Sequence, residues 1–109
     1  MQKGRRTWQS FEEMRKAAEE GDPQAQCNLG LMFDRGCAVE LNHFEAARLY
    51  GLAAEQNVAI AETNLGVAYE QGCGVPQDIN AAITWYRKAA AQGETHAMKY
   101  LRNLGYAAD

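Results

Sequence analysis

The residues best suited to chemistry in this chain are its cysteines and histidines. The 109-residue sequence has three cysteines, Cys27, Cys37 and Cys73, and two histidines, His43 and His96. A zinc site needs several such residues at ligand spacing, for example a CxxC pair, and this spacing does not occur. The sequence therefore predicts no metal site and no cofactor, and it predicts that both histidines are solvated surface residues.

A serine nucleophile is not expected either. Ser10 is the only serine in the chain, and it begins a segment of helical character. A serine hydrolase holds its nucleophile in a strained turn beside a histidine, and no such motif is present. The chain is therefore not expected to be an enzyme.

Composition narrows the choice of partners. The chain has 11 Lys and Arg residues against 14 Asp and Glu residues, a net charge of −3, whereas nucleic-acid binding usually demands a basic excess. Hydrophobic residues make up 47% of the chain, which is enough for one globular domain. No apolar window reaches the length of about 18 residues that a membrane span needs. We expect a protein or peptide partner, with no nucleic acid and no membrane span.

The dominant pattern is an internal repeat of 36 residues. Residues 25–39 match residues 61–75, and both segments read Ala-x-x-Asn-Leu-Gly at the start and Gly-Cys-x-Val at the end. Half units continue the pattern on both sides, so we expect a single repeat domain over 1–109. Its units are a half repeat 8–21, a repeat 22–57, a repeat 58–93 and a half repeat 94–107.

Each full repeat predicts two helices. In the first repeat, Asp22 is suited to the N-cap of a helix that runs to about Arg35, and Gly36 to its left-handed C-cap. Asn42 and its equivalent Asp78 are suited to the N-caps of the second helices. No alternating apolar pattern with hairpin residues is present. The sequence therefore predicts an all-α fold of about six helices.

Glycine recurs in the middle of the first helices. Gly30 and Gly66 hold equivalent positions, and glycine inside a helix costs about 1 kcal/mol relative to alanine. We expect these glycines to let a neighbouring helix approach closely, while Tyr50 and Tyr86 of the second helices fill the remaining space. Their role is therefore packing.

The repeated motif resembles a known family. Ala-x-x-Asn-Leu-Gly-x-x-Phe/Tyr-x-x-Gly-Cys-x-Val, followed by Ala-x-x-x-Tyr-x-x-Ala-Ala, is similar to the Sel-one-like repeat, a relative of the 34-residue tetratricopeptide repeat. The resemblance covers about residues 10–104. The first repeat departs from the pattern at Ala38, Glu40 and Gly51. The resemblance implies a right-handed superhelix (a short solenoid) of antiparallel helix pairs, which acts as an adaptor for protein–protein contacts.

The candidate binding residues lie on the first helices, which the resemblance places along a concave groove. If Ala25, Leu29 and Phe33 face the core, a neighbouring stripe of each first helix faces this groove. The candidate peptide-binding residues are Gln24, Asn28, Leu31, Arg35, Ile60, Asn64, Val67, Gln71, His96, Lys99, Tyr100 and Asn103.

Two kinds of polar residue in this set point to a peptide ligand. The amides of Asn28 and Asn64 can both donate to and accept from a peptide backbone, although they are equally suited to bonds within the scaffold. Arg35 and Lys99 are suited to an acidic side chain or a C-terminal carboxylate. The favoured function is therefore a module that holds a peptide or a partner helix in the groove.

Two other functions are weighed against this one. The first is a structural or consensus-like scaffold without a native ligand. The second is a β-lactam-binding, enzyme-like member, because some cysteine-rich proteins of the family are described as binding or hydrolysing β-lactams. That chemistry needs paired helix cysteines and an active serine or its equivalent, and this chain has neither.

The ends of the array carry charge where the inner repeats are apolar or small. Glu13 is equivalent to Leu49, and Arg102 is equivalent to Gly66. Solenoids need polar outer faces on their terminal units. We therefore expect a capped short array that is mainly monomeric.

The cysteines are expected to be free thiols. Cys37 and Cys73 are equivalent residues of successive repeats, which places them about 16–20 Å apart because packed helices lie about 8–10 Å apart. A disulfide needs Cα atoms within about 7 Å. Three free thiols are consistent with a reducing compartment, and we expect a cytoplasmic location.

Overall fold

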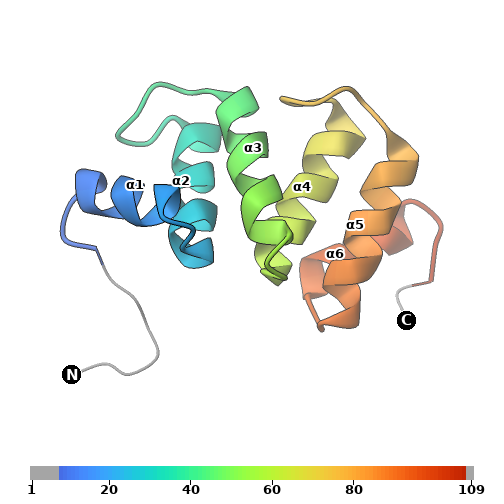
Figure 1. The fold of residues 1–109 in the computed structure, drawn as a ribbon. Helices are drawn as coiled ribbons and strands as arrows, with labels where there is room; N and C mark the ends of the chain where they lie inside the picture. Colours follow the sequence, from blue (N-terminus) through green and yellow to red (C-terminus); the bar gives the residue numbers. More distant parts are fainter. Residues whose placement is uncertain (1–7, 108–109) are drawn as a thin grey trace.

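The computed structural model describes residues 8–107 of the chain, which form six α-helices (Figure 1). No strand occurs in this range, so the expected all-α fold of about six helices is confirmed. The helices are α1 (Phe11–Glu19), α2 (Pro23–Arg35), α3 (His43–Ala54), α4 (Ala59–Gln71), α5 (Ile79–Ala91) and α6 (Thr95–Asn103).

The helices pack in the order in which they follow one another in the chain. Each helix contacts the next one, from α1 with α2 to α5 with α6. Figure 1 shows a single row, with α1 at one end and α5 and α6 at the other. The molecule measures 42 × 31 × 19 Å along its principal axes, which is the shape of a short solenoid. No helix within residues 8–107 is long and apolar enough to cross a membrane.

The helix ends follow the predicted capping residues. The side chains of Asp22, Asn42 and Asp78 each accept a hydrogen bond from a backbone N–H of the first turn of α2, α3 and α5, respectively. Gly36 and Gly72 end α2 and α4 in the left-handed conformation, with φ of 67° and 68°. Because these caps satisfy backbone groups that the helix leaves unpaired, they fix where each helix begins and ends.

The mid-helix glycines make room for a tyrosine ring of the paired helix. A Cβ built on Gly30 would lie 2.8 Å from Cε1 of Tyr50, and one built on Gly66 would lie 2.5 Å from Cε1 of Tyr86. Both tyrosines are buried, with 2% and 0% of their surface exposed. The predicted packing role of the glycines is therefore confirmed, and the group that approaches them is the ring itself.

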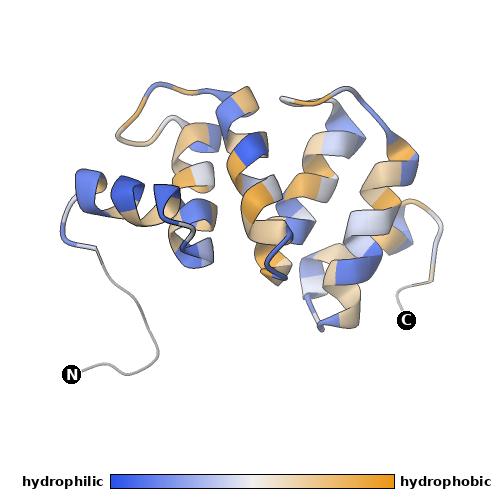
Figure 2. Cartoon of the chain, viewed as in Figure 1, coloured by the Kyte–Doolittle hydropathy of each residue, from blue (hydrophilic) through white to orange (hydrophobic). Residues whose placement is uncertain are grey.

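The core consists largely of alanines, with a few larger side chains between them. Ala25, Ala53, Ala61, Ala89 and Ala97 are all 0% exposed. Such small side chains let neighbouring helix backbones lie close together. Figure 2 shows α1 as largely hydrophilic on its visible side and α3 with apolar residues along its length.

Two equivalent loop residues adopt the same left-handed conformation, at a higher energetic cost for alanine than for glycine. Gly74 has φ of 79° and lies against α3, where a Cβ would overlap the carbonyl oxygen of His43. Ala38 is its equivalent one repeat earlier and has φ of 64°. A side chain in this region costs roughly 1–2 kcal/mol. The departure of the first repeat from the family pattern at this residue therefore introduces local strain.

Candidate functional site

None of the twelve predicted binding residues belongs to the core. Seven are exposed, namely Gln24, Arg35, Ile60, Gln71, His96, Lys99 and Asn103. Five are half-buried, namely Asn28, Leu31, Asn64, Val67 and Tyr100. They lie on α2, α4 and α6, the first helices of the repeats. We call this set of twelve residues the first-helix surface.

The middle of the first-helix surface borders a pocket between α3 and α4. The pocket has a volume of about 120 Å³, and Asn64, Val67 and Gln71 line it from α4. The residues predicted on α2 and α6 do not line this pocket. Its other walls are formed by Asp34, His43, Ala46, Ala47, Tyr50, Ala68 and Cys73. Of the twelve predicted residues, the structure therefore brings Asn64, Val67 and Gln71 together at one pocket.

Asn64 lines this pocket, and its side-chain amide forms no hydrogen bond with any residue in the range 8–107. Its equivalent Asn28 accepts a long hydrogen bond of 3.5 Å from Nε2 of Gln24 on the same helix. A half-buried amide without a protein partner can both donate to and accept from a ligand. Asn64 is therefore the member of the set best placed for recognition.

The pocket also contains an unpredicted polar network. Nδ1 of His43 lies 2.9 Å from Oδ1 of Asp34, and the Tyr50 hydroxyl donates to Oδ2 of Asp34 at 3.1 Å. His43 is half-buried as a residue, but its side chain is 37% exposed, so it contacts solvent as predicted while it also pairs with Asp34. Burial, together with the charge of Asp34, raises the pKa of Tyr50 well above its usual range. Tyr50 therefore remains a neutral donor.

The tyrosine–carboxylate hydrogen bond of this network recurs in the second repeat. The Tyr86 hydroxyl donates to Oε1 of Glu70 at 2.6 Å. The ring of Tyr100 packs against that of Tyr86, with the centroids 5.4 Å apart. The recurrence of a carboxylate two residues before each loop glycine, and of a tyrosine in the next helix, was a visible signal for this pairing in the sequence.

His96 at the start of α6 is exposed, as predicted, and is held by the cap of that helix. Its Nδ1 lies 3.1 Å from Oε2 of Glu94, and Thr63 donates to Oε1 of the same carboxylate at 2.6 Å. Burial alone raises the pKa of Glu94, but hydrogen bonds from Thr63, His96 and the backbone N–H of Ala97 hold the pKa below its ordinary value. Glu94 therefore anchors α6 to α4 as a carboxylate.

The cysteines are free thiols in three different environments, as the repeat spacing predicts. Cys27 is buried, Cys73 is half-buried and Cys37 is exposed. Burial raises the pKa of Cys27 to about 11, so its sulfur is a poor nucleophile near neutral pH. No cluster of three potential metal ligands exists among residues 8–107.

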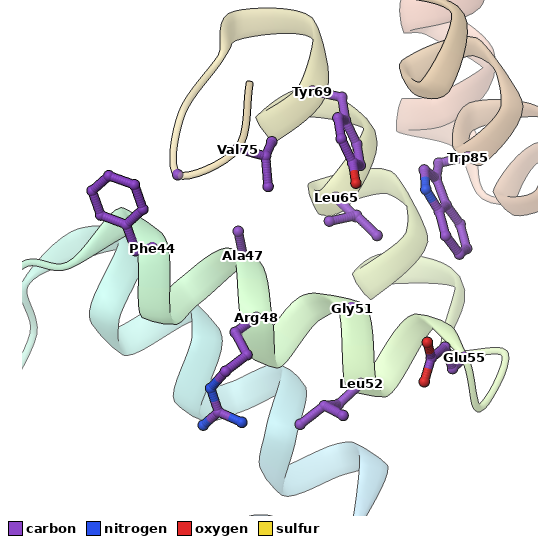
Figure 3. Close-up of a pocket in the computed structure, with 11 residues that line it drawn as sticks. Phe44, Ala47, Arg48, Gly51, Leu52, Glu55, Leu65, Tyr69, Val75 and Trp85 are labelled. Atoms are coloured by element: carbon purple, nitrogen blue, oxygen red, sulfur yellow. The ribbon is translucent and has the colours of Figure 1, made fainter. Parts of the chain in front are cut away.

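Two larger clefts, which sequence reasoning missed, lie among the second helices. One is bordered by α1, α2 and α3 and has a volume of about 450 Å³, and the other is bordered by α3, α4 and α5 and has a volume of about 390 Å³. Figure 3 shows the second cleft, with Phe44 on α3, Tyr69 on α4 and Trp85 on α5. Arg48 and Leu52 line both clefts and separate them.

The repeats of this chain match a family pattern. The pattern of the Sel1 repeat matches residues 23–58 and 59–94, which together make up more than half of the chain. The chain belongs to the Sel1 repeat family. No curated protein sequence matches this Sel1 repeat chain.

Solved structures with Sel1 repeats are similar to this chain. A Sel1 repeat protein from Oxalobacter formigenes is 40% identical, with a TM-score of 0.83 over 85% of this chain and 70% of that one. A protective antigen of uropathogenic Escherichia coli with an SLR fold is 37% identical, with a TM-score of 0.82 over 88% of this chain and 21% of the antigen. Helicobacter pylori cysteine rich protein B is 26% identical, with a TM-score of 0.77 over 84% of this chain and 68% of that one.

These matches show that the chain is a Sel1 repeat scaffold. Sel1 repeats generally mediate protein interactions, and this chain has their scaffold of sequential helix pairs. The chain spans about a fifth of the length of the Escherichia coli antigen.

Proposed function

We propose that this Sel1 repeat chain binds a peptide segment of a partner protein along its first-helix surface. The observation that carries this proposal is the amide of Asn64, which borders a pocket and has no hydrogen-bond partner within the described residues. A peptide backbone offers both a donor and an acceptor to such an amide. One side chain of the peptide occupies the pocket beside Val67.

The charge of the first-helix surface favours an acidic segment or a C-terminal carboxylate as the ligand. None of the twelve residues is acidic, although the whole chain carries a net charge of −3. Arg35 and Lys99 are exposed and form no ion pair with residues 8–107. A carboxylate of the ligand supplies the charge-assisted partner that these two cations lack.

The experiment is selection of a displayed library of random dodecapeptides against the purified chain, followed by measurement of each affinity by fluorescence anisotropy. Asn64→Ala is expected to lower the affinity of the chain for the selected peptides at least 10-fold, because it removes both the donor and the acceptor. Asn80→Ala makes the same change at an exposed residue of α5 and is expected to leave the affinity unchanged.

Two results would overturn the proposal. One is a set of selected peptides whose affinity is the same for the wild type, Asn64→Ala and Tyr100→Ala. The other is a library from which no peptide is enriched.

A further inference from the structure

The cleft between α3 and α5, which we call the α3–α5 cleft, has a largely apolar lining, and at its α5 wall the ammonium of Lys88 lies 4.7 Å from the ring centroid of Trp85. Leu65 and Tyr69 of α4 lie between its walls, and Trp85 faces them from α5 (Figure 3). Phe44 and Leu52 of α3 lie at its border, where they are 76% and 36% exposed. Its volume of about 390 Å³ is enough for several side chains of a partner.

The equivalent cleft one repeat earlier is bordered by an ion pair. Arg15 and Glu19 lie one turn apart on α1, with Nε of the arginine 3.5 Å from the carboxylate, and both side chains line that cleft. The aliphatic part of an arginine covers apolar surface while its guanidinium pairs with the carboxylate.

In the α3–α5 cleft, the arginine of this pair is missing. The equivalents of Arg15 and Glu19 are Gly51 and Glu55. A Cβ built on Gly51 meets no atom within 4 Å, so the space of the missing side chain is open. Arg87, at the same position of α5, lies over the ring of Tyr106 at 5.2 Å. Of the three equivalent positions, only Gly51 lacks an arginine.

This absence leaves a negative charge without its counterpart. Glu55 is exposed and forms no ion pair or hydrogen bond through its side chain with residues 8–107. Arg48, two turns before Glu55 on α3, is held by Glu45 in a two-point contact. The cleft therefore combines an apolar lining with one unpaired carboxylate at its border.

We propose that the α3–α5 cleft binds an amphipathic helix of a partner protein that places an arginine over Gly51. The guanidinium of this arginine pairs with Glu55, as Arg15 pairs with Glu19 in the preceding cleft. Apolar side chains one turn away on the partner helix contact Tyr69, Trp85 and Phe44. The proposal concerns the opposite layer of the molecule from the first-helix surface and does not depend on that site.

The walls of the cleft favour a helix over an extended strand. The backbone groups of α3, α4 and α5 are paired within their own helices, so they offer no edge to which a strand could bond. A helix satisfies its own backbone and presents side chains at successive turns to the groove between two neighbouring helices.

The test is selection of a displayed library of stapled helical peptides, with one face randomised, against the wild-type chain. Gly51→Arg restores the residue found at the two equivalent positions and fills the cleft from within. It is expected to keep the helical circular dichroism of the wild type and to melt at a somewhat higher temperature, because arginine has a greater helix propensity than glycine. The enriched peptides are expected to carry an arginine with apolar residues one turn away. Their affinity for Gly51→Arg is expected to be at least 10-fold lower than their affinity for the wild type.

Three further variants make the result specific. Gly51→Ala is the matched control, because it changes the same residue but leaves the cleft open, and it is expected to bind as the wild type does. Glu55→Gln is expected to lower the affinity for the arginine-containing peptides several-fold. Asn64→Ala is expected to leave them unaffected, which separates this site from the proposed peptide site.

The proposal is overturned if no helical peptide is enriched or if the enriched peptides lack arginine. It is equally overturned if folded Gly51→Arg binds the enriched peptides as tightly as the wild type does.

Discussion

The ring of Tyr86 lies directly against the Cα of Gly66, and a Cβ on that residue would sit 2.5 Å from Cε1 of the ring. The same relationship joins Tyr50 and Gly30 one repeat earlier. Each tyrosine also donates a hydrogen bond to a carboxylate of the helix that carries the glycine. The tyrosine therefore holds the two helices of a repeat together through both packing and a partly buried hydrogen bond.

Gly66→Ala is expected to destabilise the chain by up to about 2 kcal/mol. Alanine gains about 1 kcal/mol of helix propensity, but overpacking against a fully buried ring costs about 1–3 kcal/mol or more. Urea unfolding followed by circular dichroism measures the difference. Gly51→Ala is the matched control in open space, and it is expected to stabilise the chain by about 0.5–1 kcal/mol. A stabilising Gly66→Ala would contradict the packing described here.

Ala38→Gly is expected to stabilise the first repeat by about 0.5–1 kcal/mol. It relieves a φ of 64° that costs roughly 1–2 kcal/mol for alanine, and part of this gain is offset by the greater freedom of glycine in the unfolded chain. The reverse change, Gly74→Ala, is expected to lower the melting temperature, because its Cβ overlaps the carbonyl of His43. If Ala38→Gly and Gly74→Ala both melted at the temperature of the wild type, neither the strain at Ala38 nor the close contact at Gly74 would hold.

Glu62→Gln is expected to stabilise the chain by about 1 kcal/mol at pH 7. Its equivalent Gln26 accepts from Gln56 and donates to the carbonyl of Ala18. Glu62 is 2% exposed and accepts from Gln92, but its side chain lacks the N–H group through which Gln26 donates to a carbonyl. Thermal unfolding of Glu62→Gln and of the reverse change, Gln26→Glu, should give shifts of opposite sign.

The attachment of α6 is expected to weaken in acid. The pKa of Glu94 is lowered in the folded state, so its contribution to stability is fully present at neutral pH and is lost as the pH falls below about 4.3 toward the lowered value. Melting temperatures between pH 7 and pH 3 measure this loss. Glu94→Gln is expected to lose less stability over that range than the wild type, and parallel curves for the two proteins would disprove the role of the carboxylate.

The thiols are expected to react in the order of their exposure. Cys37 is exposed and should be alkylated by iodoacetamide at pH 8 before Cys73, whereas Cys27 is buried with a pKa near 11 and should react only when the chain opens. Mass spectrometry of time points identifies each site, and three thiols should be counted after unfolding without reductant. Early modification of Cys27 would show that α2 does not pack as described.

The elements of the fold could be predicted because each one has a local signal. Asp22, Asn42 and Asp78 mark helix starts by side-chain chemistry, and Gly36 and Gly72 mark helix ends by their conformational freedom. The 36-residue repeat gives the second-helix N-cap and the C-terminal glycine twice, whereas Val58, the equivalent of Asp22, forms no side-chain cap. Exposure of the first-helix surface also follows from helix periodicity, because residues beside the core stripe face outward.

The contacts between helices could not be predicted in the same way. His43 pairs with Asp34 because the start of α3 returns to the end of α2, and a periodic pattern does not describe that loop. Gly51 was visible as a departure from the repeat, but its consequence depends on α3 and α5 bordering one cleft. The sequence shows that a side chain is missing at Gly51, but only the structure shows that the space beside it is open.

Peptide binding on the first-helix surface can be followed by an NMR titration of the ¹⁵N-labelled chain with a selected dodecapeptide. The proposed site predicts that the side-chain amide signal of Asn64 and the backbone signals of Val67 and Gln71 shift together and saturate at one peptide per chain. Shifts confined to α3 and α5, with the Asn64 amide unchanged at saturation, would contradict it.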